Sequence, residues 1–299
     1  RSAVTAEAVI AYDDMEPMQP RIIDLGTSHR IYAKAGCPLG RILEFRIYSP
    51  MKYRVKGKLR LFDVKGLQPA SLRTNFEVES LSVVGLTLNE PAPQEFSFGY
   101  ELLDGTNKVI FKSPVLNYTV IDGFAVAPEG ELPPDYCVVV DGDENVACKV
   151  TAECAKRDTP YPAIPPINTC KFWYDIDSGS RFFRLSPTVD LPLPAKPLEL
   201  GFWLYGDRSG SIARCRFIDS NGQVFQPEGV AIEWQGWRYR TMPLDGTTCS
   251  WWGGPADGKI HGPLKWDSLF LLDTLGKETK GTIYLGPMMI VSEPEETTE

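Results

Sequence analysis

Short stretches of alternating hydrophobic and polar residues recur along the chain, and none repeats with the period of an amphipathic helix. Residues 51–63 alternate strictly, and residues 76–88 and 94–122 add further hydrophobic runs, the last interrupted by Asp104-Gly105-Thr106-Asn107. A period of two residues places side chains on opposite faces of a strand, and Asp-Gly between two apolar runs favours a tight turn. The pattern predicts short antiparallel strands.

The first 120 residues are typical of an immunoglobulin-like β-sandwich, since they combine short strands and turns without helical periodicity. One face of the strand over 51–63 carries five cations. They could contact an anionic polymer, although the favoured interpretation is a solvated sheet face whose charges oppose edge pairing with other chains. The five are Lys52, Arg54, Lys56, Lys58 and Arg60.

The second half repeats the strand-and-turn pattern with more aromatic residues. Residues 196–226 contain an aromatic strand, a turn at Gly206-Asp207-Arg208-Ser209-Gly210, an Arg-bearing strand and a turn at Asp219-Ser220-Asn221-Gly222. Trp234-Gln235-Gly236-Trp237 then enters another strand, and a closing strand follows a Gly-rich loop. Gly, Asp, Asn and Ser at these turns are the residue types that β-turns require.

This order of elements over residues 136–292 resembles the galactose-binding-like β-jelly-roll modules attached to secreted carbohydrate-active enzymes. The resemblance rests on the Gly-Asp-x-x-Gly turn, the Arg-bearing strand ending in Asp-x-x-Gly, and Trp-x-Gly-Trp. It implies a jelly roll that binds a polysaccharide or an oligosaccharide. The expected fold class is therefore all-β, an immunoglobulin-like sandwich followed by a jelly roll.

Composition changes along the chain and divides it. All seven Trp lie between Trp173 and Trp266, and six of the seven Cys lie between Cys137 and Cys249. A stretch rich in Gly, Pro and acidic residues separates the halves, as linkers do. We predict a first domain over 1–122, a linker over 123–135 and a second domain over 136–299, with no sheet crossing the linker.

Charge and hydropathy exclude some partners. The formal net charge is −8, whereas a nucleic-acid-binding protein needs a basic surface. No apolar run reaches the roughly 18 residues that span a bilayer. We therefore expect neither nucleic acid nor a membrane span. The chain begins at Arg1 without a signal sequence, so we expect a processed protein or a piece of a longer, multidomain one.

Four cysteines within residues 137–170 favour an oxidising, extracellular setting. We expect at least one disulfide among them, while Cys215, which alternates with Ala213 and Phe217, is expected to be a buried thiol. Reduced, buried cysteines in a cytoplasmic protein are the alternative.

Catalytic motifs are absent from the sequence. It holds two His and contains no HExxH, no GxSxG, no phosphate loop and no dinucleotide fingerprint. A pair of carboxylates, which a glycosidase needs, is a constellation that sequence cannot exclude. We expect no catalytic residue and favour binding over catalysis.

The alternation of side chains along three predicted strands indicates a candidate binding surface. Sugars present flat apolar faces and hydroxyl rims, which aromatic rings and hydrogen-bonding side chains complement. We predict an exposed aromatic face flanked by two arginines, and the alternative is that the aromatic residues pack in the core. The loop that follows contains a further aromatic pair, which either binds a ligand or caps the core. The candidates are Trp203, Tyr205, Arg214, Arg216, Trp237, Tyr239, Trp251 and Trp252.

Many modules of the resembled family hold a structural calcium ion, with a carboxylate near the end of the last strand. Gly286-Pro287 stands there in this chain. Asp141, Asp143 and Glu144 could supply oxygen ligands, but an acidic turn is more often solvated. We expect no cofactor and leave structural calcium as an open alternative.

These observations predict a non-catalytic carbohydrate-binding or accessory region of a larger secreted polysaccharide-processing protein. The arginines would suit an anionic glycan. Two alternatives stay open: a structural spacer or adhesion module, and a β-sandwich glycoside hydrolase or polysaccharide lyase.

Overall fold

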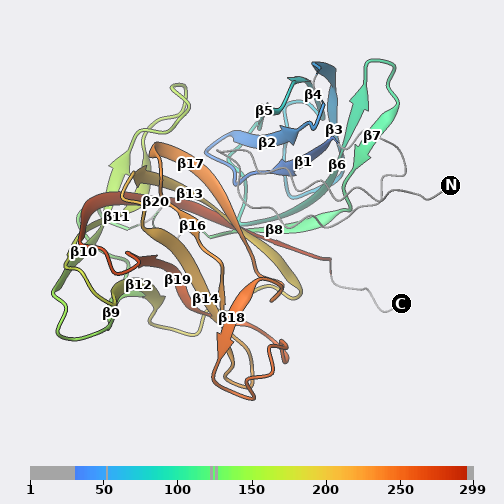
Figure 1. Cartoon of the computed structure of the whole chain (residues 1–299). Coiled ribbons are helices and arrows are strands. Elements are labelled where there is room, and N and C mark those ends of the chain that lie inside the picture. Colours follow the sequence, from blue (N-terminus) through green and yellow to red (C-terminus); the bar gives the residue numbers. More distant parts are fainter. Residues whose placement is uncertain (1–30, 52, 122–123, 125–126, 295–299) are drawn as a thin grey trace.

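The computed structural model describes residues 31–51, 53–121, 124 and 127–294, and every regular element in this part is a β-strand (Figure 1). The all-β class is thus confirmed. Among these residues there is no helix capable of crossing a membrane. The first eight strands are β1 (Tyr32–Ala35), β2 (Ile42–Tyr48), β3 (Val55–Lys65), β4 (Arg73–Val78), β5 (Leu81–Thr87), β6 (Glu95–Asp104), β7 (Val109–Lys112) and β8 (Leu116–Ile121).

The remaining strands belong to the second half of the chain, and most are antiparallel neighbours within one of two sheets. They are β9 (Tyr136–Gly142), β10 (Cys148–Arg157), β11 (Ile167–Ile176), β12 (Arg181–Pro187), β13 (Pro197–Asp207), β14 (Ile212–Ile218), β15 (Val224–Pro227), β16 (Val230–Ala231), β17 (Gln235–Pro243), β18 (Cys249–Trp252), β19 (Lys265–Asp273) and β20 (Thr279–Ser292).

The first sandwich packs a three-stranded sheet, in the order β1-β2-β5, against the strands β8-β6-β3-β4. Its core is aromatic, because alternate residues of β2, β6 and β8 face inward. Phe98 lies 4.4 Å from Tyr118 between ring centroids, and Phe45 lies 5.2 Å from Tyr100. The immunoglobulin-like type of this sandwich stays a prediction.

The second sandwich packs a seven-stranded sheet, in the order β18-β15-β14-β19-β12-β9 with β16 beside β14, against β10, β11, β20, β13 and β17. Two antiparallel sheets that enclose one core confirm the β-sandwich and jelly-roll architecture predicted for this half. Five of the largest fully buried side chains fill that core: Phe172, Phe183, Phe202, Phe217 and Phe270.

Strand β20 joins the two sandwiches. Its residues Met288–Ser292 pair with β8 of the first sandwich and with β13 of the second, so one ten-stranded sheet runs through both (Figure 1). Along β20, Met288 and Ile290 enter the second core, while Met289 and Val291 enter the first. The expectation that no sheet crosses the linker is therefore wrong, because the C-terminal strand returns to the N-terminal half. The domain limits at 122 and 136 stay a prediction.

Carboxylates neutralise most of the cationic face beside β3. Arg54 and Lys56 both pair with Glu77, and Arg60 pairs with Glu101. The hydrogen bond from Lys56 holds the pKa of Glu77 below its usual value. Of the five predicted cations, Arg54, Lys56 and Arg60 form this paired face, and Lys58 donates a 3.3 Å hydrogen bond to Asn107. Lys52 lies outside the described residues.

The seven cysteines form no disulfide bond in the structure. Cys154 and Cys170 are cross-strand partners on β10 and β11, and both are buried. The expectation of a disulfide between residues 137 and 170 is therefore wrong, and the crowding of these cysteines in the sequence reflects neighbouring strands. Cys215 is a buried thiol, as predicted.

The buried thiols are expected to resist alkylation. Burial raises the pKa of Cys170 and of Cys215 well above the usual value for a thiol. Because the thiolate is the nucleophile, these groups stay protonated at pH 8 and react slowly. Mass spectrometry after iodoacetamide treatment should find Cys170 and Cys215 unlabelled in the native protein and labelled in guanidinium. Rapid native labelling of both would contradict this assignment.

Candidate functional site

Two cross-strand pairs of aromatic residues occupy one face of β13 and β17, Trp203 opposite Tyr239 and Tyr205 opposite Trp237. The first pair is not open to solvent, because both side chains are only 2% exposed and belong to the core of the first sandwich. The indole Nε1 of Trp203 donates a hydrogen bond of 3.0 Å to the carbonyl of Cys37. The predicted exposed platform is therefore wrong for Trp203 and Tyr239, since the first sandwich covers this half of the face.

Tyr205 and Trp237 are partly exposed and contact each other edge to face, with 5.7 Å between ring centroids. The guanidinium of Arg157 lies 3.9 Å from the ring centroid of Tyr205 and 4.6 Å from that of Tyr284. Tyr205 and Trp237 therefore remain candidates for ligand contact, but in the company of Arg157 instead of the predicted arginines.

Arg214 and Arg216 lie on β14, which belongs to the seven-stranded sheet, in the layer opposite β13 and β17. The prediction that they flank the aromatic face of β13 and β17 is therefore wrong. Alternation had correctly separated them from the buried residues of their own strand, but it contains no information about the sheet to which the strand belongs. The buried set is Ala213, Cys215 and Phe217.

Trp251 and Trp252 are 44% and 41% exposed on the edge strand β18. Trp251 is paired with the buried Phe225, and Trp252 with Val224, so the two indoles lie on opposite sides of the sheet. Trp252 shares the outer face with Arg216, whose guanidinium carbon lies 5.2 Å from the indole centroid.

The same guanidinium lies 5.1 Å from the ring centroid of Phe182 on β12. Phe182, Arg216 and Trp252 therefore form a row that crosses the outer face from β12 to β18. Because the guanidinium carbon of Arg216 lies within 5.2 Å of both ring centroids, the two rings are at most about 10 Å apart, although β19, β14 and β15 separate their strands. We call this row the aromatic–arginine row.

An open cleft of about 540 Å³ adjoins the row on the outer face of the seven-stranded sheet. We call it the sheet-face cleft. Its walls come from β12, β14, β15 and β19 and from the turns beside β12 and β19. The lining residues are Gly179, Ser180, Arg181, Phe182, Arg216, Gln226, Leu271, Asp273, Leu275 and Gly276.

Polar contacts hold the arginines of this face in place. Nε of Arg216 donates a 2.7 Å hydrogen bond to Gln226 Oε1. Partial burial lowers the pKa of Arg216, because the charged form has lost part of its hydration. Nearby, Arg184 donates hydrogen bonds of 2.6 Å to Asp141 and 3.2 Å to Asp267. The face thus presents aromatic rings and oriented donors together.

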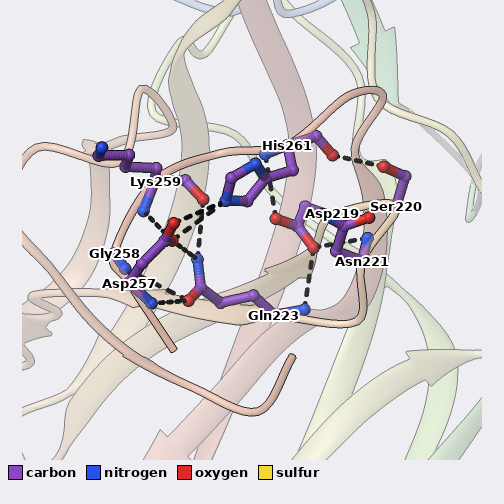
Figure 2. Close-up of polar contacts among 8 residues, drawn as sticks. All are labelled: Asp219, Ser220, Asn221, Gln223, Asp257, Gly258, Lys259 and His261. Atoms are coloured by element: carbon purple, nitrogen blue, oxygen red, sulfur yellow. Dashed lines mark hydrogen bonds and ion pairs between the residues drawn. The ribbon is translucent and has the colours of Figure 1, made fainter. Parts of the chain in front are cut away.

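The loop that follows Trp252 is anchored by a buried amide (Figure 2). The side chain of Gln223 is fully buried and accepts hydrogen bonds from the backbone N–H groups of Asp257, at 2.8 Å, and of Gly258, at 3.3 Å. Its amide nitrogen donates to the carbonyl of Lys259 at 2.8 Å. One side chain therefore binds three successive residues of the loop.

A second anchor is Asp219, which is 3% exposed. Its carboxylate accepts backbone hydrogen bonds from Asn221 and Gln223, both at 2.9 Å, and from His261 at 3.0 Å (Figure 2). His261 Nε2 in turn lies 3.0 Å from Asp257 Oδ2. The backbone N–H of Lys259 and the contact with His261 lower the pKa of Asp257. The turn at 219–223 and the loop after β18 therefore form one rigid unit beside the row.

Sequence reasoning missed Phe182, Gln226 and Arg181. The run Arg181-Phe182-Phe183-Arg184-Leu185-Ser186 does alternate, so a strand with Phe182 and Arg184 on one face was readable. What could not be read is that β12 and β14 are both neighbours of β19, which brings Phe182 to Arg216.

Two of the three acidic residues considered as calcium ligands have other partners. Asp141 pairs with Arg184, and Asp143 accepts hydrogen bonds from the backbone and the side chain of Asn145. Those bonds lower the pKa of Asp143. Glu144 belongs to the same turn. No cluster of three or more His, Cys, Asp or Glu residues that could hold a metal ion occurs among the described residues. Structural calcium at this turn stays an open alternative.

Comparison with known proteins finds similar structures. A family 11 carbohydrate-binding module from Clostridium thermocellum, in complex with a β-1,3-1,4-mixed-linked tetrasaccharide, is 12% identical with a TM-score of 0.42, covering 62% of this chain and 100% of that one. The same kind of module in the cellulosomal cellulase Lic26A-Cel5E of that organism is 11% identical, with a TM-score of 0.40, over 60% and 97%.

The module TmCBM61, in complex with β-1,4-galactotriose, is 19% identical with a TM-score of 0.26, covering 57% of this chain and 94% of that one. No family model and no curated protein matches the sequence. The structural neighbours are thus carbohydrate-binding modules with β-sandwich folds. At these TM-scores the neighbours carry no argument about the ligand of this chain. Evidence about that ligand must come from the residues of the chain itself.

Proposed function

We propose that this chain is a non-catalytic carbohydrate-binding region whose binding surface is the aromatic–arginine row and the adjoining sheet-face cleft. The observation that carries the proposal is the placement of Arg216 between Phe182 and the exposed Trp252 at an open cleft. A sugar ring can stack its apolar face on the indole while its hydroxyls accept hydrogen bonds from the guanidinium. No bond is made or broken in this mechanism.

The geometry suits an extended ligand. The row crosses several strands, and the cleft is open at the surface, so a polysaccharide could pass over it without presenting a chain end. The partner is therefore a polysaccharide or an oligosaccharide, neutral or anionic. Rigid anchoring of the adjacent loop by Gln223 and Asp219 supports this role, because a preformed surface loses little conformational entropy on binding.

We further propose that the chain acts outside the cell, as the accessory region of a larger polysaccharide-processing protein. Polysaccharide substrates lie largely outside cells, which supports this location. The cysteines do not support it, because they form no disulfide.

Replacing Trp252 by alanine is expected to weaken glycan binding by about tenfold or more, because truncation of an exposed aromatic anchor removes contact area mainly from the complex. The ligand would be identified on a glycan array, and affinities would be measured by isothermal titration calorimetry. The melting temperature of the variant should stay close to that of the wild type, since Trp252 is 41% exposed.

The neighbouring tryptophan offers a matched control. Trp251 has nearly the same exposure but lies on the other side of β18, so Trp251→Ala should keep its affinity within about threefold, a change of less than one kcal/mol. If both variants lost glycan affinity equally, the aromatic–arginine row would not be the binding surface. If no glycan on the array bound, a structural spacer or adhesion module would be favoured. Release of reducing sugar or unsaturated product would favour a glycoside hydrolase or a polysaccharide lyase.

A further inference from the structure

The sheet-face cleft contains an excess of positive charge. Three ionisable side chains line it, those of Arg181, Arg216 and Asp273. Asp273 is already occupied, because one carboxylate oxygen lies 3.5 Å from Nε of Arg214 and the other accepts the backbone N–H of Leu275 at 2.9 Å. Arg216 therefore has no acidic partner in the walls of the cleft.

Arg216 is the more constrained of the two. Its Nε donates to the neutral Gln226, and its guanidinium lies against two rings. It forms no ion pair with any carboxylate in the described part of the chain. Asp267 and Asp141 attract Arg216 electrostatically, but both form their ion pairs with Arg184. A partly buried charge without an ion-pair partner of its own is costly, and an anion that enters the cleft would relieve that cost.

Arg181 also lines the cleft, but its charge serves other residues. It alternates with Phe182 along β12, so its side chain starts on the opposite face of the strand from Phe182. Its Nη1 donates to the carbonyl of Gly142 at 3.1 Å, and its charge contributes, after the hydrogen bonds from Asn145, to the lowered pKa of Asp143. Arg216 is therefore the cation that an anion in the cleft would meet.

We infer that the glycan bound at this surface carries an anionic substituent, a carboxylate or a sulfate ester, which lies in the sheet-face cleft against Arg216. This inference rests on the proposed carbohydrate-binding function. The planar guanidinium matches the two oxygens of either anion and forms charge-assisted hydrogen bonds with them.

Charges outside the cleft do not favour binding of an anionic glycan. The chain has a net charge of −8, so its overall field repels polyanions. The cations beside β3 are largely paired with carboxylates. Binding of an acidic glycan would therefore depend on Arg216, and its affinity should fall with added salt because charges are screened.

The test compares matched oligosaccharides by calorimetry. A galacturonic acid tetrasaccharide is paired with its methyl ester, and a sulfated galactan tetrasaccharide with its desulfated form. One acidic form should bind about tenfold more tightly than its neutral counterpart at low salt, and the arm that shows the preference identifies the anion. Arg216→Gln should abolish the preference, and Arg216→Lys should keep part of it. Arg181→Gln, at a side chain that starts on the opposite face of β12, should keep the preference and is the matched control. If the Arg216 variants fold poorly, loss of the wild-type preference on adding salt provides the same readout.

The outcomes separate the inference from the proposed function. In one outcome, the wild type binds acidic and neutral sugars with equal affinity and Trp252→Ala binds neither. That result would overturn the inference of an anionic substituent and leave the proposed carbohydrate binding intact. A preference for the acid that persists in Arg216→Gln, or that added salt does not weaken, would also overturn the inference. Absence of binding to every sugar in both arms and on the array would contradict the proposed function itself.

Discussion

Replacing Trp203 by alanine is expected to lower the free energy of unfolding by about 3 to 5 kcal/mol, the usual cost of removing a large buried aromatic side chain. Trp203 is 2% exposed and packs against Tyr239, with 5.4 Å between ring centroids. The guanidinium of Arg46 lies 5.9 Å from the Trp203 ring centroid. The hydrogen bond from Trp203 Nε1 to the carbonyl of Cys37 would be lost as well. Urea denaturation measures the change.

Trp237→Ala is the control for this prediction, because Trp237 lies on the same face but is partly exposed. It should cost less stability than Trp203→Ala. A Trp203→Ala protein with unchanged stability and lost glycan affinity would contradict the burial of this residue and restore the aromatic platform of β13 and β17 as the binding surface.

Replacing Met289 by alanine is expected to destabilise the protein by about 2 to 5 kcal/mol and to affect both sandwiches together. Met289 is fully buried in the first core, yet it lies on β20 between Met288 and Ile290, which are buried in the second. Since the same strand pairs with β8 and β13, loosening it removes backbone hydrogen bonds from both halves.

Differential scanning calorimetry would test this coupling. We expect one unfolding transition in the wild type and in Met289→Ala, with calorimetric and van't Hoff enthalpies that agree. Met288→Ala, one residue away on the opposite face of the strand, should lower the same single transition. Two separate transitions, of which Met289→Ala shifts only the first sandwich, would show that the halves fold independently.

The composition of the cysteine-rich segment illustrates how a sequence signal can mislead. Cys154 and Cys170 lie 16 positions apart in the sequence, and a disulfide-rich segment was a reasonable expectation. In the structure they are opposed on adjacent strands as buried thiols, a position that small hydrophobic side chains of any kind could occupy. A high density of cysteines indicates an oxidising compartment only if their sulfur atoms form disulfide bonds. The sequence does not show which cysteines are bonded.

The sequence by itself determined the local features: strands at most of the alternating runs, turns at Asp104–Asn107 and Asp219–Gly222, and the separation of Arg214 and Arg216 from the buried residues of β14. These depend on side-chain period and turn chemistry, which act between near neighbours in the chain.

Only the tertiary structure decided which strands are neighbours. It buried Trp203 and Tyr239 under the first sandwich, placed Arg216 between Phe182 and Trp252, and joined the two halves through β20. Such contacts link residues far apart in the chain, and an alternating pattern is the same whichever sheet a strand enters. Alternation assigns a side chain to one face of its own strand, and the packing of the sheets decides whether that face meets a core or solvent.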